Sequence, residues 1–344
     1  MEQRQCSSEA LGAARRRRLA LSAVAAVAAA VLSASAARGQ SVMSWFDPRL
    51  IKSRPVADYR TRIYATKAGV RNQTGHMRYA RQQFSFTMPV VHTDTEQWRL
   101  TTQVTSLRLK NGARMPDTGE AFPDELWDLR FGGGYGRRLD PERTVGIHAT
   151  VGSAGDKPFA TADETAMSAV GFFYKADDET SGWLVYATAQ AQLDGTGAYA
   201  FPGVGYHMQT ERIQALLGLP VFWARVKPVE PVALQGLAMP SRVMLDATWT
   251  VIDDVALFAT YDWEWQRYVR HDRFKRDEHL FYTEQRVWGG LEWDITKDIK
   301  FVAAGGYGFD RRFYEADNYF GGSQRNRMSI GDGPMMYFRL RIRF

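Results

Sequence analysis

The last eleven residues of the sequence, Pro334 to Phe344, alternate between apolar and polar side chains. Side chains on a β-strand point to opposite faces with a period of two, so this segment is predicted to be a strand with one apolar and one cationic face. The apolar face carries Met336, Phe338, Leu340, Ile342 and Phe344, and the other face carries Tyr337, Arg339, Arg341 and Arg343. A regular strand at the very end of the chain is unexpected in a soluble domain, because chain termini usually fray.

This pattern resembles the closing strand of bacterial outer-membrane β-barrels. In that class the terminal aromatic residue and the alternating apolar positions before it are read by the barrel-assembly machinery. The resemblance therefore implies an outer-membrane protein that is recognised by that machinery through the strand ending at Phe344. It also implies contact with outer-membrane lipid and lipopolysaccharide.

The beginning of the sequence favours export. Four arginines at 15–18 precede an uncharged apolar run from Leu19 to Leu32, and small residues follow. This order is typical of a secretory signal peptide, predicted here as residues 1–39 with cleavage after Ala36 or Gly39. Fourteen residues of helix span about 21 Å, less than the roughly 30 Å of a bilayer core. The general secretory route is favoured, because a barrel crosses the inner membrane unfolded.

The predicted signal peptide accounts for most of the excess positive charge. It holds six of the 44 basic residues and two of the 38 acidic ones, so the remaining chain is almost balanced. The basic pI is therefore no sign of nucleic-acid binding. The only cysteine, Cys6, lies in the same segment. After its removal the chain has no disulfide, thiolate nucleophile or cysteine metal site.

The body of the chain alternates in hydrophobicity over runs of ten to sixteen residues and contains no long apolar helix. Short polar turns at 140–143, 177–180, 252–254 and 296–298 alternate with longer connections at 111–124, 155–164, 268–278 and 315–332. We therefore predict an all-β fold, an antiparallel up-and-down transmembrane β-barrel. At about 22–25 residues per strand and connection, twelve strands are expected, within a range of 10–14.

The predicted barrel comprises residues 59–344, and residues 40–58 are expected to form a periplasmic N-terminal arm. The segment from Ile213 to Met239 is hard to divide into strands, because four prolines interrupt it or follow it closely. The alternative of a soluble β-sandwich or small soluble barrel predicts shorter strands and does not explain Phe344. The membrane barrel is therefore favoured.

Catalytic motifs are absent from the sequence. It has no Gly-x-Ser-x-Gly, His-Glu-x-x-His or phosphate-binding loop, so no catalytic, metal or cofactor residues are assigned. One long connection gathers His271, Asp272, Asp277 and His279, and a site at the outer rim is conceivable there. A charged, solvated loop explains these residues more simply.

Charged residues on the predicted lumen face carry more information. These are Asp262, Glu264, Glu284, Arg286, Glu292, Arg339, Arg341 and Arg343. In a wide barrel they line a watery pore and set its ion preference. In a narrow barrel they pair across the lumen and plug it. Eight strands fill a barrel and sixteen leave a channel, so a twelve-stranded barrel leaves both interpretations open.

A narrower resemblance begins near Leu216. Leu219 to Pro228, Leu237 to Pro240, Glu284 to Trp293 and Gly305 to Arg312 resemble a family of uncharacterised outer-membrane β-barrel proteins, known only as a domain of unknown function. The resemblance implies a porin-like barrel in the outer membrane and offers no activity.

The leading interpretation is a non-enzymatic outer-membrane barrel that acts as a small passive pore or as a structural envelope protein. One alternative is a barrel enzyme that hydrolyses lipid or peptide at the outer rim, which requires His271, His279 and nearby acids to converge. Another is an adhesin or scaffold that presents the long loops. The sequence leaves open the solute, the oligomeric state and whether the lumen is open.

Overall fold

The structure is a computed structural model that describes residues 50, 54–65, 68–71, 76–110, 112–193, 198–273, 275–317 and 324–344. The predicted signal peptide, its cleavage positions and residues 40–49 lie outside this part of the chain. Within the described residues no helix is long and apolar enough to cross a membrane.

Almost every described segment with regular structure is a β-strand, and neighbours along the chain are joined antiparallel. The strands are β1 (Val56–Tyr64), β2 (Ala68–Gly69), β3 (His76–Met77), β4 (Ala80–His92), β5 (Glu96–Arg108), β6 (Glu125–Arg138), β7 (Arg143–Gly155), β8 (Thr165–Ala176), β9 (Ser181–Gln192) and β10 (Tyr199–Gln209). They continue with β11 (Ile213–Leu219), β12 (Phe222–Val229), β13 (Val232–Met239), β14 (Arg242–Ile252), β15 (Val255–Tyr268), β16 (His279–Thr296), β17 (Ile299–Ala316), β18 (Arg325–Ile330) and β19 (Gly333–Arg343). A short 3₁₀ helix, η4 (Ala162–Glu164), lies between β7 and β8.

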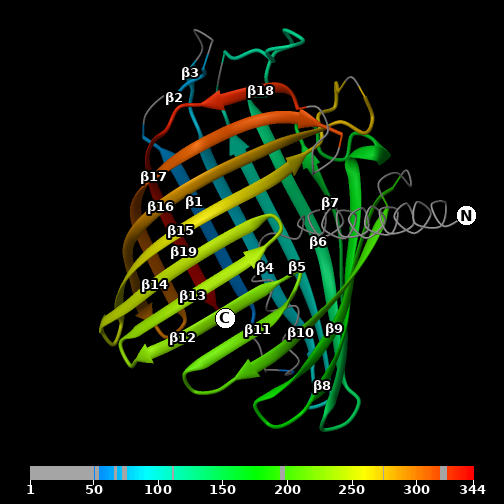
Figure 1. Cartoon of the computed structure of the whole chain (residues 1–344), viewed down its shortest axis with the longest axis vertical. Coiled ribbons are helices and arrows are strands. Elements are labelled where there is room, and N and C mark those ends of the chain that lie inside the picture. The colour runs from blue at the N-terminus through cyan, green and yellow to red at the C-terminus, as the bar shows by residue number, and fades with distance from the viewer. Residues whose placement is uncertain are drawn as a thin grey trace, which may run out of the picture.

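The strands close into one barrel (Figure 1). Strand β1 pairs with β4 on one side and with β19 on the other, which joins the two ends of the sheet. Strands β18 and β19 lie end to end along β17, so they occupy one position in the ring. The small β2–β3 hairpin stands apart from the wall. The barrel therefore has 16 strands.

The predicted number of about twelve strands is wrong. The error arises in the region of short strands, where β11, β12 and β13 contain only seven or eight residues each. Pro220, Pro231 and Pro240 lie in the turns between these strands, while Pro228 lies where the β12–β13 register shifts. Proline lacks an amide proton, so it belongs in turns and irregular positions of a sheet. The prolines that obscured this segment therefore mark its hairpins.

The barrel wall follows the predicted alternation of faces. Large apolar side chains point outward and are exposed all around the ring, among them Trp98, Phe131, Val185, Leu245 and Leu340. A closed barrel satisfies every backbone group between strands and can face lipid with an apolar surface. The barrel and its apolar exterior agree with the predicted location, and the protein is an outer-membrane β-barrel.

The two ends of the barrel differ. Tight turns such as 93–95, 139–142, 253–254 and 297–298 gather at the end where β1 begins and β19 finishes. Long connections after β1, β5, β7, β15 and β17 gather at the opposite end, the upper end in Figure 1. Outer-membrane barrels have short periplasmic turns and long extracellular loops, so we refer to the upper end as the outer mouth. Strand β1 starts at Val56, three residues before the predicted start of the barrel.

Candidate functional site

A cluster of charged side chains is buried inside the barrel, and we call it the ion cluster. Its acids are Asp262 and Glu264 of β15 and Glu284 of β16, and its bases are Arg62, Arg81, Arg242 and Arg286 of β1, β4, β14 and β16. Asp262 and Glu284 are completely buried, and the side chain of Arg286 is 3% exposed. The ion cluster contains four of the eight residues that were singled out from the sequence.

Arg286 lies at the centre of the ion cluster. Its guanidinium donates to Glu284 at 2.8 Å and to Glu264 at 2.8 Å, and it also pairs with Asp262. Arg62 donates to Glu284 at 2.6 Å although β17 and β19 separate their strands in the ring. The ion cluster thus joins parts of the wall that are not neighbours. Removing one member of a buried network leaves its partners as uncompensated charges, which is strongly destabilising.

The other four residues singled out from the sequence lie apart from the ion cluster. Arg339 pairs with Asp58 of β1, which also accepts a 2.8 Å hydrogen bond from Arg60. Glu292 pairs with Lys300 at 3.2 Å. For Arg341 and Arg343 the described part of the chain shows no ion pair with a carboxylate, and the nearby Asp58 is shared by Arg60 and Arg339.

At the outer mouth the end of β15 crosses the barrel to reach β7. Seven strands separate β7 from β15 in either direction around the ring, so they lie on opposite walls. Nevertheless the amide of Val269 donates to the carbonyl of Ala154 at 2.7 Å, and Val269 forms a parallel bridge with Gly155. A Cβ atom on Gly155 would lie 2.2 Å from the Val269 carbonyl oxygen, so only glycine permits this approach.

The connection after β15 is tied to the connection between β7 and β8, to the connection between β5 and β6, and to the end of β17. His271 Nδ1 lies 2.7 Å from Glu164 Oε1, and Arg273 pairs with Asp163. Arg270 pairs with Glu120 at 2.6 Å and with Glu315 at 3.1 Å. We call these contacts of residues 269–273, together with the Val269–Gly155 bridge, the latch.

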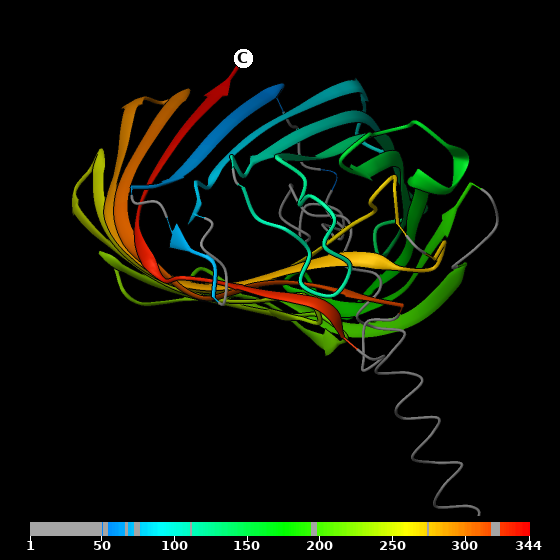
Figure 2. The same ribbon diagram turned by 90° about the horizontal axis from the view of Figure 1, so that it is seen from above.

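Apolar packing accompanies the latch. Figure 2 shows the segment between β5 and β6 running across the opening of the ring. Met115 and Phe122 of this segment pack with Met77 of the β2–β3 hairpin and with Tyr282 and Phe313 of the wall, and all five are buried. The outer mouth is therefore closed on this side by a small hydrophobic core.

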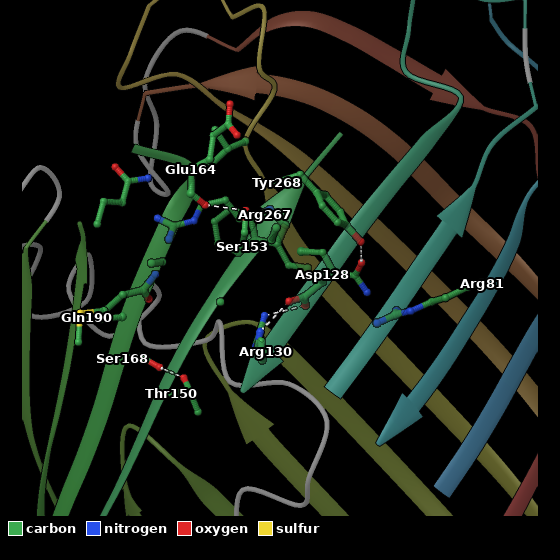
Figure 3. A pocket seen from close by; sticks show the side chains of 18 residues that line it. Arg81, Asp128, Arg130, Thr150, Ser153, Glu164, Ser168, Gln190, Arg267 and Tyr268 are labelled. Carbon is green, nitrogen blue, oxygen red and sulfur yellow. Dashed lines mark hydrogen bonds and ion pairs between the residues drawn. The ribbon is translucent and has the colours of Figure 1, made fainter. Parts of the chain in front are cut away.

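A polar pocket lies beneath the latch (Figure 3). The view shows the Asp128–Arg130 pair in the middle, Arg81 on one side and Thr150, Ser168 and Gln190 on the other. Arg130 holds Asp128 through two hydrogen bonds of 2.7 Å. The hydroxyl groups of Thr150 and Ser168 are 2.6 Å apart. The lining therefore combines neutralised charges with hydroxyl and amide groups.

The histidines proposed for an enzyme at the rim have separate surroundings. His271 contacts Glu164, whereas the Nδ1 atom of His279 contacts the backbone carbonyl of Asp277 and its Nε2 atom lies 3.5 Å from Gln192. Asp272 lies near Lys157. No contact described in the structure joins the two histidines, so the convergence that a rim enzyme requires is not observed. Among the described residues no group of three or more His, Cys, Asp or Glu is arranged to hold a metal ion.

Several residues of these sites were not singled out from the sequence. Arg62, Arg81 and Arg242 complete the ion cluster, and Glu164 and Asp163 receive the latch. The alternation of apolar and polar residues in β1 and β4 places Arg62 and Arg81 on the lumen face, so the sequence contained a signal for these two residues. No sequence pattern indicates that residues 163 and 164 contact residues 271 and 273.

No family model matches the chain, and no curated protein does, so the resemblance to a domain of unknown function is not supported. Solved outer-membrane proteins align with most of the chain at low identity. The Pseudomonas putida toluene transporter TodX is 9% identical, with 89% of this chain and 94% of that chain covered and a TM-score of 0.39. An outer membrane channel from Pseudomonas putida F1 is 10% identical, with coverages of 87% and 98% and a TM-score of 0.37.

A Pseudomonas aeruginosa FadL homologue is 10% identical, with 86% of this chain and 92% of that chain covered and a TM-score of 0.38. TM-scores this low do not establish a common fold. The chain itself forms a closed outer-membrane barrel of 16 strands, larger than the small porin-like barrel expected from the sequence.

Proposed function

We propose that the protein is a non-enzymatic, passive channel for small solutes across the outer membrane, gated at its outer mouth by the latch. Barrels of sixteen strands are wide enough to leave an aqueous lumen. The observation that carries the proposal is the contact of Val269 with Gly155, which draws opposite walls together at the outer mouth through backbone atoms.

The latch has the properties of a releasable closure. The members of its ion pairs lie in the connection after β15, on η4 and in the connection between β5 and β6, and only Glu315 lies on a strand of the wall, β17. Glu120 is 47% exposed, whereas Asp163, Glu164 and Glu315 are at most 13% exposed. Connections of this kind can open locally while the strands of the wall stay folded. The ion cluster lies on strands, and we propose that it narrows the lumen without opening and closing.

A structural envelope barrel is the second candidate. It is favoured by the buried core around Met115 and Phe122, which fills part of the mouth, and by the complete burial of Asp262 and Glu284. In that case the charges are a plug and the lumen never conducts.

Conductance in planar lipid bilayers separates the two candidates. We expect the wild-type barrel to open in discrete but infrequent steps. The double variant Asp163→Asn, Arg273→Gln removes one hydrogen-bonded ion pair of the latch without leaving either charge unpaired. It should raise the open probability about two- to fivefold, the equivalent of about 0.5–1 kcal/mol. Asp140→Asn, in a periplasmic turn that pairs with Arg143, is the matched control and should leave it unchanged.

Silence from both the wild type and the double variant, in samples whose barrels are folded, would overturn the channel and favour the structural barrel. Equal open probability in all three proteins would preserve the channel but remove the latch as its gate.

A further inference from the structure

The pocket beneath the latch is built from both walls of the barrel. Its lining comes from β4, β6, β7, β8 and β9 on one side and from Gln266 and Tyr268 of β15 on the other. Gln190, Ser153 and Gln266 are buried, with less than 8% of each residue exposed. A solute that occupies this pocket therefore touches opposite walls at the point where the latch joins them.

The acids of the pocket are unsuited to hold a cation. Arg130 covers both oxygens of Asp128. Glu164 accepts from the amide of Ala160 at 3.1 Å and contacts His271. A cationic solute would have to displace one of these partners.

Anions are disfavoured for the corresponding reason. The guanidinium of Arg81 faces Glu264 at 3.1 Å, and that of Arg130 faces Asp128. Each of these two positive charges is compensated by a carboxylate within hydrogen-bond distance, so the two pairs offer an anion little net attraction. The third arginine of the lining, Arg267, takes part in a further interaction of its own. An apolar solute is disfavoured because it would strip water from hydroxyl and amide groups without replacing their hydrogen bonds, at about 1–3 kcal/mol for each group.

Hydrogen-bond donors and acceptors remain for an uncharged polar solute. Arg130 Nη1 and Arg81 Nε are buried and have no acceptor within the described part of the chain. Thr150 and Ser168 share one hydrogen bond between two hydroxyl groups, which leaves one proton and further lone pairs for another partner. The ring of Tyr268 also lines the pocket and offers an apolar face for C–H groups.

We propose that this pocket binds a small uncharged solute rich in hydroxyl oxygens, with the chemistry of a monosaccharide. The hydroxyl oxygens accept from Arg130 and Arg81, and the solute hydroxyls exchange hydrogen bonds with Thr150 and Ser168. The inference rests on the proposed channel, because the solute reaches the pocket through the lumen. Solute bound there also lies against Gln266 and Tyr268, directly before the latch begins at Val269.

Calorimetric titration of the full-length mature barrel, in a detergent without a sugar headgroup, tests the site. Four probes are compared. Glucose is the uncharged probe, glucuronate and glucosamine are its anionic and cationic counterparts, and toluene is the apolar one. We expect saturable binding of glucose and at least tenfold weaker binding of the other three.

The variant Thr150→Val, Ser168→Ala removes the hydroxyl pair at nearly constant shape. It should weaken glucose binding about tenfold, the equivalent of losing hydrogen bonds worth about 1.4 kcal/mol in total. The matched control is Thr248→Val on β14, where Thr248 donates to Asp246 outside the pocket. This control should bind glucose as the wild type does.

Absence of glucose binding, equal binding by the pocket variant, or tighter binding of glucuronate, glucosamine or toluene would each overturn the proposal. The result is separable from the conductance measurement. Glucose binding in a barrel that never conducts refutes the channel and preserves the site. Conductance without glucose binding preserves the channel and refutes the site.

Discussion

The ion cluster and the latch both pair basic side chains with carboxylates, but they differ in the elements that hold them. Every carboxylate of the ion cluster lies on β15 or β16 and is at most 8% exposed, and Arg286 has three of them as partners. In the latch Asp163 and Glu164 lie on η4, Glu120 lies in a loop and is half exposed, and only Glu315 lies on a strand. Ion pairs are therefore expected to hold the strands of the wall in place in the ion cluster and to permit movement of the loops in the latch.

The largest effect is expected from the ion cluster. Arg286→Met leaves Glu284, Glu264 and Asp262 without their common partner, and we expect it to lower the free energy of unfolding by about 3–5 kcal/mol. Urea unfolding of the barrel in lipid vesicles measures this loss. Arg312→Gln breaks the exposed pair with Asp310 and is the control, with an expected loss below about 1 kcal/mol. Similar losses for both variants would erase the distinction between buried and exposed pairs.

The close approach of Gly155 to Val269 should be the most sensitive point of the latch. In Gly155→Ala the new Cβ atom meets the Val269 carbonyl oxygen, a backbone atom that cannot rotate away. We expect the overpacking to cost about 1–3 kcal/mol locally and to raise the open probability of the channel in a bilayer. Gly69→Ala, whose Cβ atom meets nothing within 4 Å, is the matched control. An unchanged open probability in Gly155→Ala would separate the bridge from gating.

A smaller effect is expected at the periplasmic end. Arg341→Gln and Arg343→Gln together remove two cations of β19 for which the described part of the chain shows no carboxylate partner. The ratio of cation to anion permeability, measured from reversal potentials in a salt gradient, should rise about twofold, because charges in a solvated lumen interact weakly. Lys300→Gln, whose charge is shared with Glu292 and Asp294, should change this ratio less. A larger change in the permeability ratio for Lys300→Gln than for the double arginine variant would show that paired charges set the selectivity.

Acid should remove the contribution of the Arg273–Asp163 pair to the latch only at low pH. The hydroxyl of Thr161, which donates to Asp163, and the Arg273 guanidinium hold the pKa of Asp163 below its usual value of 3.8. A lowered pKa means that the contribution of Asp163 is complete above pH 3.8 and is lost as the pH falls through the lowered value. We expect the difference in open probability between the wild type and the variant Asp163→Asn, Arg273→Gln to be constant between pH 7 and pH 5 and to shrink below pH 3.8. A difference that already shrinks between pH 7 and pH 5 would contradict this assignment.

Sequence patterns predicted the wall better than the mouth. Alternation placed Asp262, Glu264, Glu284 and Arg286 on one face of their strands, and these four meet in the ion cluster. The turns at 140–143 and 296–298 and the long connections after β5 and β15 also agree with the structure. These features depend on local periodicity and turn chemistry, which a sequence records directly.

The features that sequence analysis missed depend on contacts between distant segments. Arg62 reaches Glu284 from 222 positions away, and Arg273 reaches Asp163 from 110 positions away. The strand count failed because β11 to β13 are shorter than a typical membrane strand, so an average length per strand underestimated their number. When the sheet closes into a barrel, segments that are far apart in the sequence face each other across the lumen. A local sequence pattern does not record which segments will meet in this way.

The distance across the latch provides the most direct test of the central claim. Spin labels at Lys157→Cys and Asp272→Cys, two exposed positions whose native side chains lie 3.7 Å apart, report it by pulsed electron spin resonance in lipid vesicles. The account predicts a single short distance in the otherwise native barrel and a longer, broader distribution after Asp163→Asn and Arg273→Gln. A long, broad distribution in the barrel with the native latch would contradict it.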